Sequence, residues 1–213
     1  MTSASQTRAP RGRLAARPSG DDREAAILAT AKHLLADRSF SDISVDDLAK
    51  GAGISRPTCY FYFPSKEAVL LSLLDPLIKR ADTGFDTALD DMPTDPKHAI
   101  RRGIEIFFSS FGSHPATARA GAEAIRTVPE FREHWAGLMD KWIRLTAALI
   151  NAERARGAAP DTLPAIDLAT SLNLMNERMI IAALADEKSA VAHGDVVDTL
   201  THIWLTSIYG TTG

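Results

Sequence analysis

Five side chains that can hydrogen-bond to DNA lie close together in the first third of the sequence. They are Arg56, Thr58, Tyr60, Tyr62 and Lys66. An arginine in the first turn of a helix can bind O6 and N7 of guanine, and a threonine can reach a phosphate or a thymine methyl group. A short buried helix has no structural need for two tyrosine hydroxyls and an arginine. The pattern therefore predicts a DNA-reading helix.

A second group of residues has the composition of a small-molecule site. One helical stripe joins large apolar side chains to a hydroxyl and consists of Trp135, Met139, Trp142, Thr146 and Leu149. Two other stripes carry Ile100, Gly103, Phe107 and Phe111, and Asn173, Asn176, Glu177 and Ile181. A packed core is the alternative reading of such stripes. Buried amides and carboxylates need hydrogen-bond partners, which are either Arg178 and backbone groups or a ligand.

Enzyme chemistry has little support in the sequence. The six histidines, which are His33, His98, His114, His134, His193 and His202, form no metal-ligand pair at three- or four-residue spacing. Phosphate-binding glycine fingerprints and a Gly-x-Ser-x-Gly motif are absent. The paired aspartates over 21–22, 46–47 and 90–91 fall at helix starts or in loops, where acids cap helices. We expect neither an enzyme nor a bound metal or cofactor.

The elements that position the DNA-reading helix follow from local signals. Ser44 and Asp47 form a predicted capping box at the start of a short helix, and the turn over residues 52–54 ends it. Ser55 then caps the helix that carries Arg56. Two short helices joined in this way predict a helix-turn-helix. A preceding helix is predicted from Asp21, with Glu24 as the second member of its cap pair.

The rest of the chain has helical periodicity and no convincing alternating strand. A helix is predicted over residues 66–90, with a kink or a break near Asp75 because Pro76 lies inside the pattern. Further helices are predicted to begin near residues 95, 114 and 128, the last running to Gly157. Two more fit residues 163–184 and 195–209. The sequence thus predicts an all-α protein of about nine helices.

Composition and charge set the context of these elements. The 213 residues are 45% hydrophobic, and one cysteine cannot form an internal disulfide, so we expect a cytoplasmic protein. No apolar run could span a membrane, and no secretory signal is evident.

Residues 1–66 hold ten Lys and Arg against seven Asp and Glu, a net charge of +3, whereas residues 67–213 hold fourteen against twenty, a net of −6. This asymmetry favours a polyanionic partner for the first segment, although chance surface variation would also produce it. Residues 1–20 are predicted to be a flexible basic tail, with Arg8, Arg11, Arg13 and Arg17.

The run ISRPTCYFYFPSKEAVL over residues 54–70, preceded by SVDDLAK over 44–50, resembles the signature of the TetR family of bacterial transcriptional regulators. Downstream segments resemble one branch of it, the mycobacterial ethionamide-resistance repressors. These segments are FF at 107–108, FGSH at 111–114, KWI at 141–143, LNLMNER at 172–178 and WLTSIYG at 204–210. The resemblance therefore extends over nearly the whole chain.

The resemblance implies a dimeric regulator with a DNA-binding domain over residues 21–66 and a ligand-binding and dimerisation domain over 67–213. Arg56, Thr58 and Tyr60 fall where bases are read. Ser44, Tyr62 and Lys66 fall where the DNA backbone is held. Cys59 departs from the larger apolar residue common at its position. We interpret it as a small hydrophobic core residue, with a redox-sensing thiol as the alternative.

The resemblance also implies a site for an elongated, mostly apolar ligand. Its matching positions are Phe107, Trp135, Met139, Trp142, Thr146, Asn173, Asn176, Glu177 and Trp204. Ile100 and Leu145 stand where those relatives carry aromatic side chains, so the shape of the site differs. With Gly103 and Ile181, these residues make up the predicted ligand site.

The last two helices are predicted to form the subunit interface. Their apolar residues are Leu168, Leu172, Met175, Val196, Val197, Leu200, Ile203 and Ile208, which could instead complete the core of one chain. The predicted function is a repressor that binds a pseudo-palindromic operator as a homodimer and is released by an apolar ligand. A helical small-molecule-binding protein or enzyme with a vestigial helix-turn-helix, and an architectural DNA protein without a ligand, are the alternatives.

Overall fold

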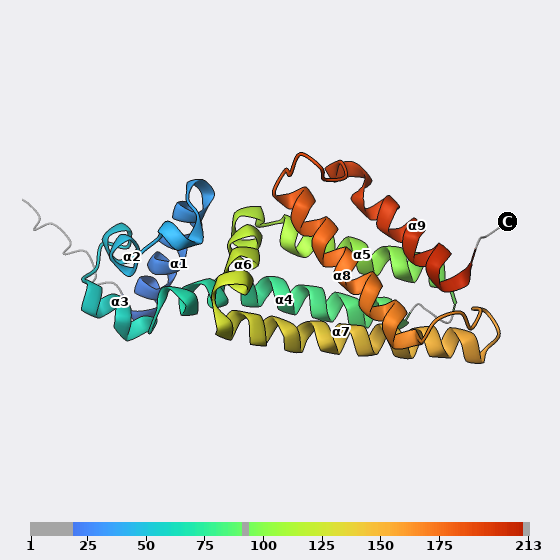
Figure 1. Ribbon diagram of the computed structural model, residues 1–213. Coiled ribbons are helices and arrows are strands. Elements are labelled where there is room, and N and C mark those ends of the chain that lie inside the picture. The colour runs from blue at the N-terminus through green and yellow to red at the C-terminus, as the bar shows by residue number, and fades with distance from the viewer. Residues whose placement is uncertain (1–18, 91–93, 211–213) are drawn as a thin grey trace, which may run out of the picture.

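The computed structural model describes residues 19–90 and 94–210, and all regular elements in these two ranges are helical (Figure 1). The α-helices are α1 (Gly20–Asp37), α2 (Val45–Gly51), α3 (Arg56–Tyr62), α4 (Lys66–Asp90), α5 (Pro96–Gly112), α6 (Pro115–Thr127), α7 (Pro129–Ala155), α8 (Ala165–Leu184) and α9 (Val196–Tyr209). Two short 3-10 helices are η1 (Phe40–Asp42) and η2 (His193–Asp195). The predicted all-α fold of about nine helices is confirmed. The basic tail predicted over residues 1–20 lies, up to residue 18, outside the described residues.

Helices α1, α2 and α3 form one end of the molecule, and the start of α4 completes their small core (Figure 1). Helix α1 begins slightly earlier than predicted, because Ser19 caps it. The hydroxyl of Ser19 accepts the backbone N–H of Asp22 at 3.1 Å, and the Asp22 carboxylate accepts the N–H of Ser19 at 2.8 Å. The predicted cap pair of Asp21 and Glu24 is therefore wrong, since the capping box lies two residues nearer the N-terminus.

The predicted helix-turn-helix is present. The hydroxyl of Ser44 accepts the N–H of Asp47 at 3.2 Å, and the Asp47 carboxylate accepts the N–H of Ser44 at 2.9 Å, which caps α2. Gly53, in the connection between α2 and α3, has a φ of +66°, a conformation that glycine adopts without the clash of a Cβ atom. The following residue, Ile54, then packs on the core between the two helices.

Helix α4 runs from the helix-turn-helix end into the larger half without interruption. Of the predicted kink or break near Asp75, the break is wrong, because Pro76 lies inside a continuous helix, and the kink stays a prediction. Proline has no N–H, so the carbonyl four residues earlier loses its helical partner. Pro76 lies on the exposed side of α4, where water can reach this part of the backbone. One helix thus belongs to both halves of the molecule.

In the larger half, α5 packs against α4 and α9, and α7 packs against α8 (Figure 1). Helix α6 crosses the inner end of this bundle and contacts α1, α4, α7 and α8. It is therefore the second helix, besides α4, that touches both the DNA-binding end and the bundle.

Most residues predicted for the subunit interface lie in the chain's own core. No more than 7% of the surface is exposed on Leu168, Leu172, Val196, Leu200 and Ile208. For these five residues the interface prediction is wrong, and the alternative of an intrachain core is correct. Periodicity identified an apolar face but could not show that α5 and α7 already cover it.

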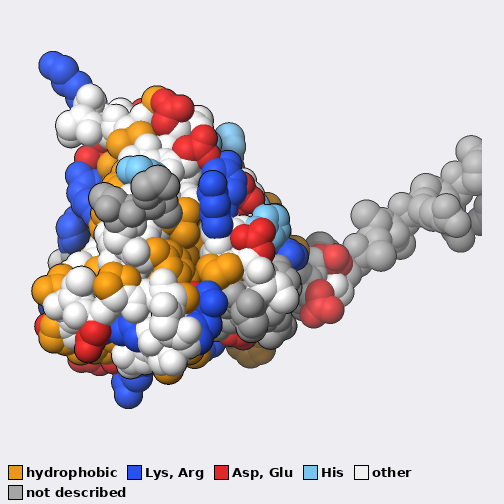
Figure 2. Space-filling view, turned by 90° about the vertical axis from the view of Figure 1, so that its right-hand side faces the viewer, with side chains coloured by type: hydrophobic (Ala, Val, Ile, Leu, Met, Phe, Trp, Pro, Cys, Tyr) orange, Lys and Arg blue, Asp and Glu red, His pale blue; other side chains and the backbone are white. Residues whose placement is uncertain are grey.

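Other apolar side chains are exposed on α8 and on the connection that precedes it. They are Leu163, Ile166 and Leu174, with exposed fractions of 56%, 47% and 50%. Figure 2 views the end of the molecule that holds the α7–α8 connection, where hydrophobic side chains reach the surface between basic ones.

Candidate functional site

Helix α3 presents Arg56 and Tyr60 to solvent at the outer face of the DNA-binding end. The guanidinium of Arg56 donates to the Tyr60 hydroxyl at 3.3 Å and lies 5.6 Å from the centre of its ring. It also forms an ion pair with Asp46 at 3.3 Å. Exposed ion pairs of this kind contribute little free energy, so Arg56 can exchange Asp46 for a base edge at small cost.

Polar groups beside Arg56 lie on the same face. The hydroxyls of Ser55 and Thr58 are 2.7 Å apart. Ser44, the N-cap residue of α2, is exposed to solvent. Cys59, by contrast, is 1% exposed, and its burial raises the pKa of the thiol. The prediction that Cys59 faces the domain core is confirmed. A raised pKa disfavours the reactive thiolate that a redox sensor needs.

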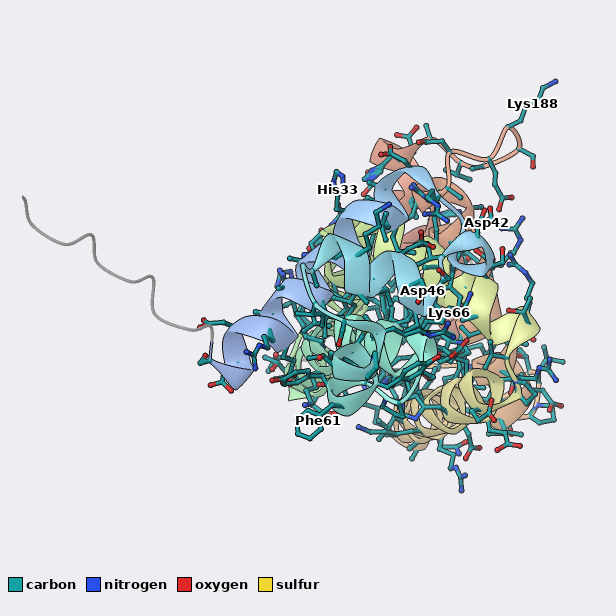
Figure 3. All side chains as sticks on the ribbon, turned by 90° about the vertical axis from the view of Figure 1, so that its left-hand side faces the viewer. His33, Asp42, Asp46, Phe61, Lys66 and Lys188 are labelled. Carbon is teal, nitrogen blue, oxygen red and sulfur yellow. The ribbon has the colours of Figure 1, made fainter. Side chains whose placement is uncertain are left out.

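Lys66 is engaged within the protein. Its ammonium donates to the carbonyl oxygens of Phe40 at 2.9 Å and Ser41 at 3.1 Å, and it lies 4.6 Å from the centre of the Phe40 ring. Figure 3 shows Lys66 directed inward among other side chains, whereas Phe61 projects outward. Lys66 thus fixes η1 in this structure, and its expected role in holding the DNA backbone stays a prediction. Tyr62 is half-buried against the core.

A first apolar cavity of about 50 Å³ lies between α4, α5, α7, α8 and α9. The predicted residues that line it are Ile100, Gly103, Phe107, Met139, Trp142, Asn173, Asn176, Glu177 and Trp204. It also contains Phe85, Ala88, Ala99, Ile104 and Leu149, of which the first two come from α4. The spacing of Ala81, Phe85 and Ala88 on α4 was the signal that could have identified this wall.

Three polar residues of α8 that line the first cavity are hydrogen-bonded to side chains of α7 and α9. The Asn173 amide donates to Thr146 Oγ1 at 3.1 Å, Trp204 Nε1 donates to Asn176 Oδ1 at 2.9 Å, and Trp135 Nε1 donates to Glu177 Oε1 at 2.8 Å.

Arg178, named as a possible partner of these groups, instead forms an ion pair with Glu187 on the outside. Burial raises the pKa of Glu177, against the opposing effect of its bond from Trp135.

A second cavity of about 30 Å³ lies between α4, α5, α6, α7 and α8. Trp135 and Ile181, predicted for the single site, line this second cavity instead. Phe107 and Glu177 line both cavities and therefore stand between them. The ring centres of Phe107 and Trp142 are 5.1 Å apart, and those of Trp135 and Trp142 are 5.8 Å apart, so the partition is a packed aromatic cluster.

Two predicted ligand residues line neither of these cavities. Thr146 is fully buried and accepts the hydrogen bond from Asn173, so it supports a wall from behind. Leu145 is half-buried on the neighbouring side of α7. Residues 145 and 146 follow Trp142 at three and four positions, and only Leu149 continues the cavity-facing stripe. Thr146 and Leu145 thus lie outside the linings of both cavities, and their contact with a ligand stays a prediction.

Among residues 19–90 and 94–210, no group of three His, Cys, Asp or Glu side chains could hold a metal ion. In the same ranges, no helix is both long and apolar enough to cross a membrane.

A helix-turn-helix at one end and a helical bundle with apolar cavities at the other define a class of DNA-binding regulator. Residues 27–73 match the model of bacterial regulatory proteins of the TetR family, and residues 100–210 match that of the C-terminal domain of the transcriptional regulator EthR. The chain belongs to the TetR family of transcriptional regulators. It is a DNA-binding regulator and not an enzyme.

Relatives match this chain over nearly its whole length. The HTH-type transcriptional regulator EthR of Mycolicibacterium smegmatis is 77% identical over 99% of this chain and 97% of its own length. The EthR of Mycobacterium tuberculosis H37Rv is 60% identical over 98% of this chain and 97% of its own. The solved structure of the TetR family regulator PfmR from Thermus thermophilus is similar in fold, with a TM-score of 0.67 and 22% identity over 88% of this chain and 99% of that one.

Proposed function

We propose that this protein is a repressor that binds a pseudo-palindromic operator as a homodimer and leaves it when an apolar small molecule enters the bundle. The proposed DNA-binding domain comprises residues 21–66, and the proposed ligand-binding and dimerisation domain residues 67–213. Operator binding requires a cytoplasmic location. The observation that carries the proposal is that α4, which begins beside α3, also lines both apolar cavities.

The size of the cavities supports a ligand that acts as a wedge. Together they offer space for only a few water molecules, whereas sites for drug-sized ligands measure about 300–1,000 Å³. An elongated ligand must therefore move Phe107, Trp135 or their helices to enter. Binding energy is then coupled to the position of α4.

The lining favours one class of ligand. Its walls are mostly aliphatic and aromatic, and Asn176 and Glu177 supply a few polar atoms near the partition. A mostly apolar molecule with one hydrogen-bonding group near its middle or end fits this distribution. The pairs Trp204–Asn176 and Trp135–Glu177 would open when such a group binds.

A second copy of the chain would cover the exposed apolar stripe on α8. Ile166 and Leu174 are eight residues apart, which places them on the same face of the helix two turns apart, and Leu163 extends the stripe at its N-terminal end. A twofold axis beside α8 would pair this stripe with itself. The family to which the chain belongs supports this arrangement, because its members act as dimers.

The test uses an operator recovered by selecting random duplexes with the wild-type protein. Primary alcohols from hexanol to dodecanol then serve as probes of chain length. A thermal shift measures their binding, since a ligand of the folded state raises the melting temperature. Fluorescence anisotropy of the operator measures release. We expect the alcohol that gives the largest thermal shift also to give the largest release of the operator. Binding of the alcohols without release would refute ligand-controlled repression.

A further inference from the structure

The short helix η1 connects the DNA-binding end to α6 through a carboxylate on the larger half. Glu123 of α6 accepts the backbone N–H of Phe40 at 3.0 Å and that of Ser41 at 2.9 Å, one on each oxygen. These two N–H groups open the first turn of η1 and have no partner within the helix. Lys66 binds the carbonyl groups of the same two residues. The turn is therefore fixed by opposite charges from two helices.

Glu123 accepts these two hydrogen bonds as a charged carboxylate. Burial favours protonation of Glu123, but hydrogen bonds from Ser41 and Phe40 and the charge of Lys66 outweigh it and lower the pKa of the carboxyl. A carboxylate that receives two adjacent backbone N–H groups is strongly directional. A displacement of α6 larger than the Glu123 side chain can absorb would either move η1 or break these bonds.

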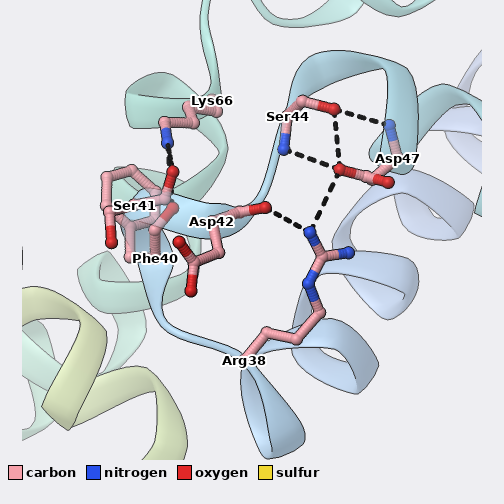
Figure 4. A network of polar contacts seen from close by, with 7 residues as sticks. All are labelled: Arg38, Phe40, Ser41, Asp42, Ser44, Asp47 and Lys66. Carbon is pink, nitrogen blue, oxygen red and sulfur yellow. Dashed lines mark hydrogen bonds and ion pairs between the residues drawn. The ribbon is translucent and has the colours of Figure 1, made fainter.

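From η1 a polar network continues to the N-terminus of α2 (Figure 4). Arg38 donates to the carbonyl of Asp42, the last residue of η1, and to the carboxylate of Asp47 at 3.4 Å. Asp47 in turn accepts the N–H and the hydroxyl of Ser44. A change in η1 is thus passed to the cap of α2, where Ser44 faces the proposed DNA surface.

The opposite face of α6 lines the second cavity through Ala118, Gly121 and Ile125. Gly121 and Glu123 are two residues apart and so point to opposite sides of the helix. A Cβ atom at Gly121 would lie 3.1 Å from two methyl carbons of Leu74, which shows how closely α6 approaches α4. An occupant larger than the second cavity would therefore press on α6 as well as on the helices of Phe107 and Trp135.

We propose that Glu123 is a positioning residue that passes movements of α6 directly to the helix-turn-helix, along a route that does not use α4. The inference rests on the proposed ligand-controlled DNA binding. In this route an occupant of the second cavity shifts α6, and Glu123 draws η1 and the α2 cap out of the orientation that fits the operator.

A double-mutant cycle on operator affinity tests the route without a ligand. Ala118→Phe fills the second cavity from within, and we expect it to weaken operator binding about tenfold. Glu123→Ala alone should weaken binding to some degree, because η1 loses two hydrogen bonds, and this variant is the baseline for the second arm of the cycle. In the double variant the effect of Ala118→Phe should disappear, because the shift of α6 no longer reaches η1. Faster amide exchange at Phe40 and Ser41 verifies that Glu123→Ala has lost both bonds.

The matched control is Glu133→Gln, which alters an exposed carboxylate on α7 and should leave the tenfold effect intact. If Ala118→Phe does not fold, Gly121→Ala takes its place, since its methyl group presses on Leu74. An equal loss with and without Glu123 would overturn the route, as would full affinity in a folded cavity-filled variant. Gly103→Trp in the first cavity separates the outcomes. If it weakens binding while Ala118→Phe does not, the proposed function stands and the Glu123 route fails.

Discussion

The indole nitrogen of Trp142 donates a hydrogen bond to Oδ1 of Asp82, with 3.2 Å between the two atoms. Lys141 donates to the same carboxylate at 2.6 Å. Trp142 is a wall of the first cavity, and Asp82 lies on α4, the helix that begins beside α3. A ligand that turns this indole must therefore act on α4 through a direct bond. In the proposed function, this contact would couple the first cavity to the helix that leads to the DNA-binding end.

Arg56 should determine sequence preference. Arg56→Ala is expected to cost about 1–3 kcal/mol per half-site and to relax the preference at one base position. Its ion pair with Asp46 is exposed, so the fold should be unaffected. Competition between single-base operator variants measures the preference, with Arg80→Ala on the exposed side of α4 as the control. An unchanged preference profile would exclude Arg56 as a base-reading residue.

Lys66 should act through the fold of the DNA-binding domain. Lys66→Ala leaves the carbonyl groups of Phe40 and Ser41 without this donor, so we expect a lower melting temperature and weaker binding to all sequences. The slope of log affinity against log salt should stay as in the wild type, because no phosphate contact is lost. A slope reduced by about one per half-site would instead show that Lys66 contacts a phosphate, as the family motif suggests.

Glu177→Gln should stabilise the protein at neutral pH. Burial raises the pKa of Glu177 above its ordinary value of 4.5, so the charged form is disfavoured in the folded state. The wild type therefore loses stability as pH rises from the unfolded pKa through the folded pKa. Glutamine avoids this loss and keeps an oxygen for Trp135. Melting temperatures should favour the variant at pH 7, and the difference should shrink toward pH 4.5. A variant less stable at pH 7 would contradict the assignment.

The exposed stripe on α8 should hold the dimer together. Charges introduced by Ile166→Glu and Leu174→Glu would be buried without partners in the proposed interface, and we expect a folded monomer. Sedimentation equilibrium measures the mass, and helical content is checked by circular dichroism. Phe61→Glu is the control, because Phe61 is 83% exposed on α3, far from α8 along the molecule. A dimer that survives both α8 substitutions would place the interface elsewhere.

The local parts of the fold could be predicted because their signals are local. Ser44 with Asp47, and Gly53 after α2, each specify a cap or a turn through bonds within a few residues. The start of α1 was missed because Ser19 and Asp22 form an equally good cap pair just outside the predicted one. Pro76 was expected to kink or break α4, but exposure to water and packing of the other face allow the helix to continue.

What the sequence could not supply was the partner of each apolar face. Leu168 and Leu172 show the same periodicity whether another helix or another subunit covers them. The division of the aromatic cluster into two cavities depends on how Phe107 and Glu177 pack between helices. Thr146 belongs to the predicted stripe of α7, yet its hydroxyl accepts a hydrogen bond from Asn173. These outcomes depend on tertiary packing, which no single segment encodes.

The most direct test of the account is operator titration of Gly103→Trp. A Cβ atom at Gly103 would lie 3.7 Å from Ala88, an ordinary contact, and the indole would then exceed the space of the first cavity. Thr146→Trp serves as the contrast, because Thr146 faces the core and its replacement should lower the melting temperature instead. Dimer mass and melting temperature of Gly103→Trp are checked before titration. We predict a folded dimer whose operator affinity falls by at least about tenfold, as if a ligand were bound. A folded, dimeric Gly103→Trp protein that binds the operator as tightly as the wild type would contradict the coupling of the cavity to DNA.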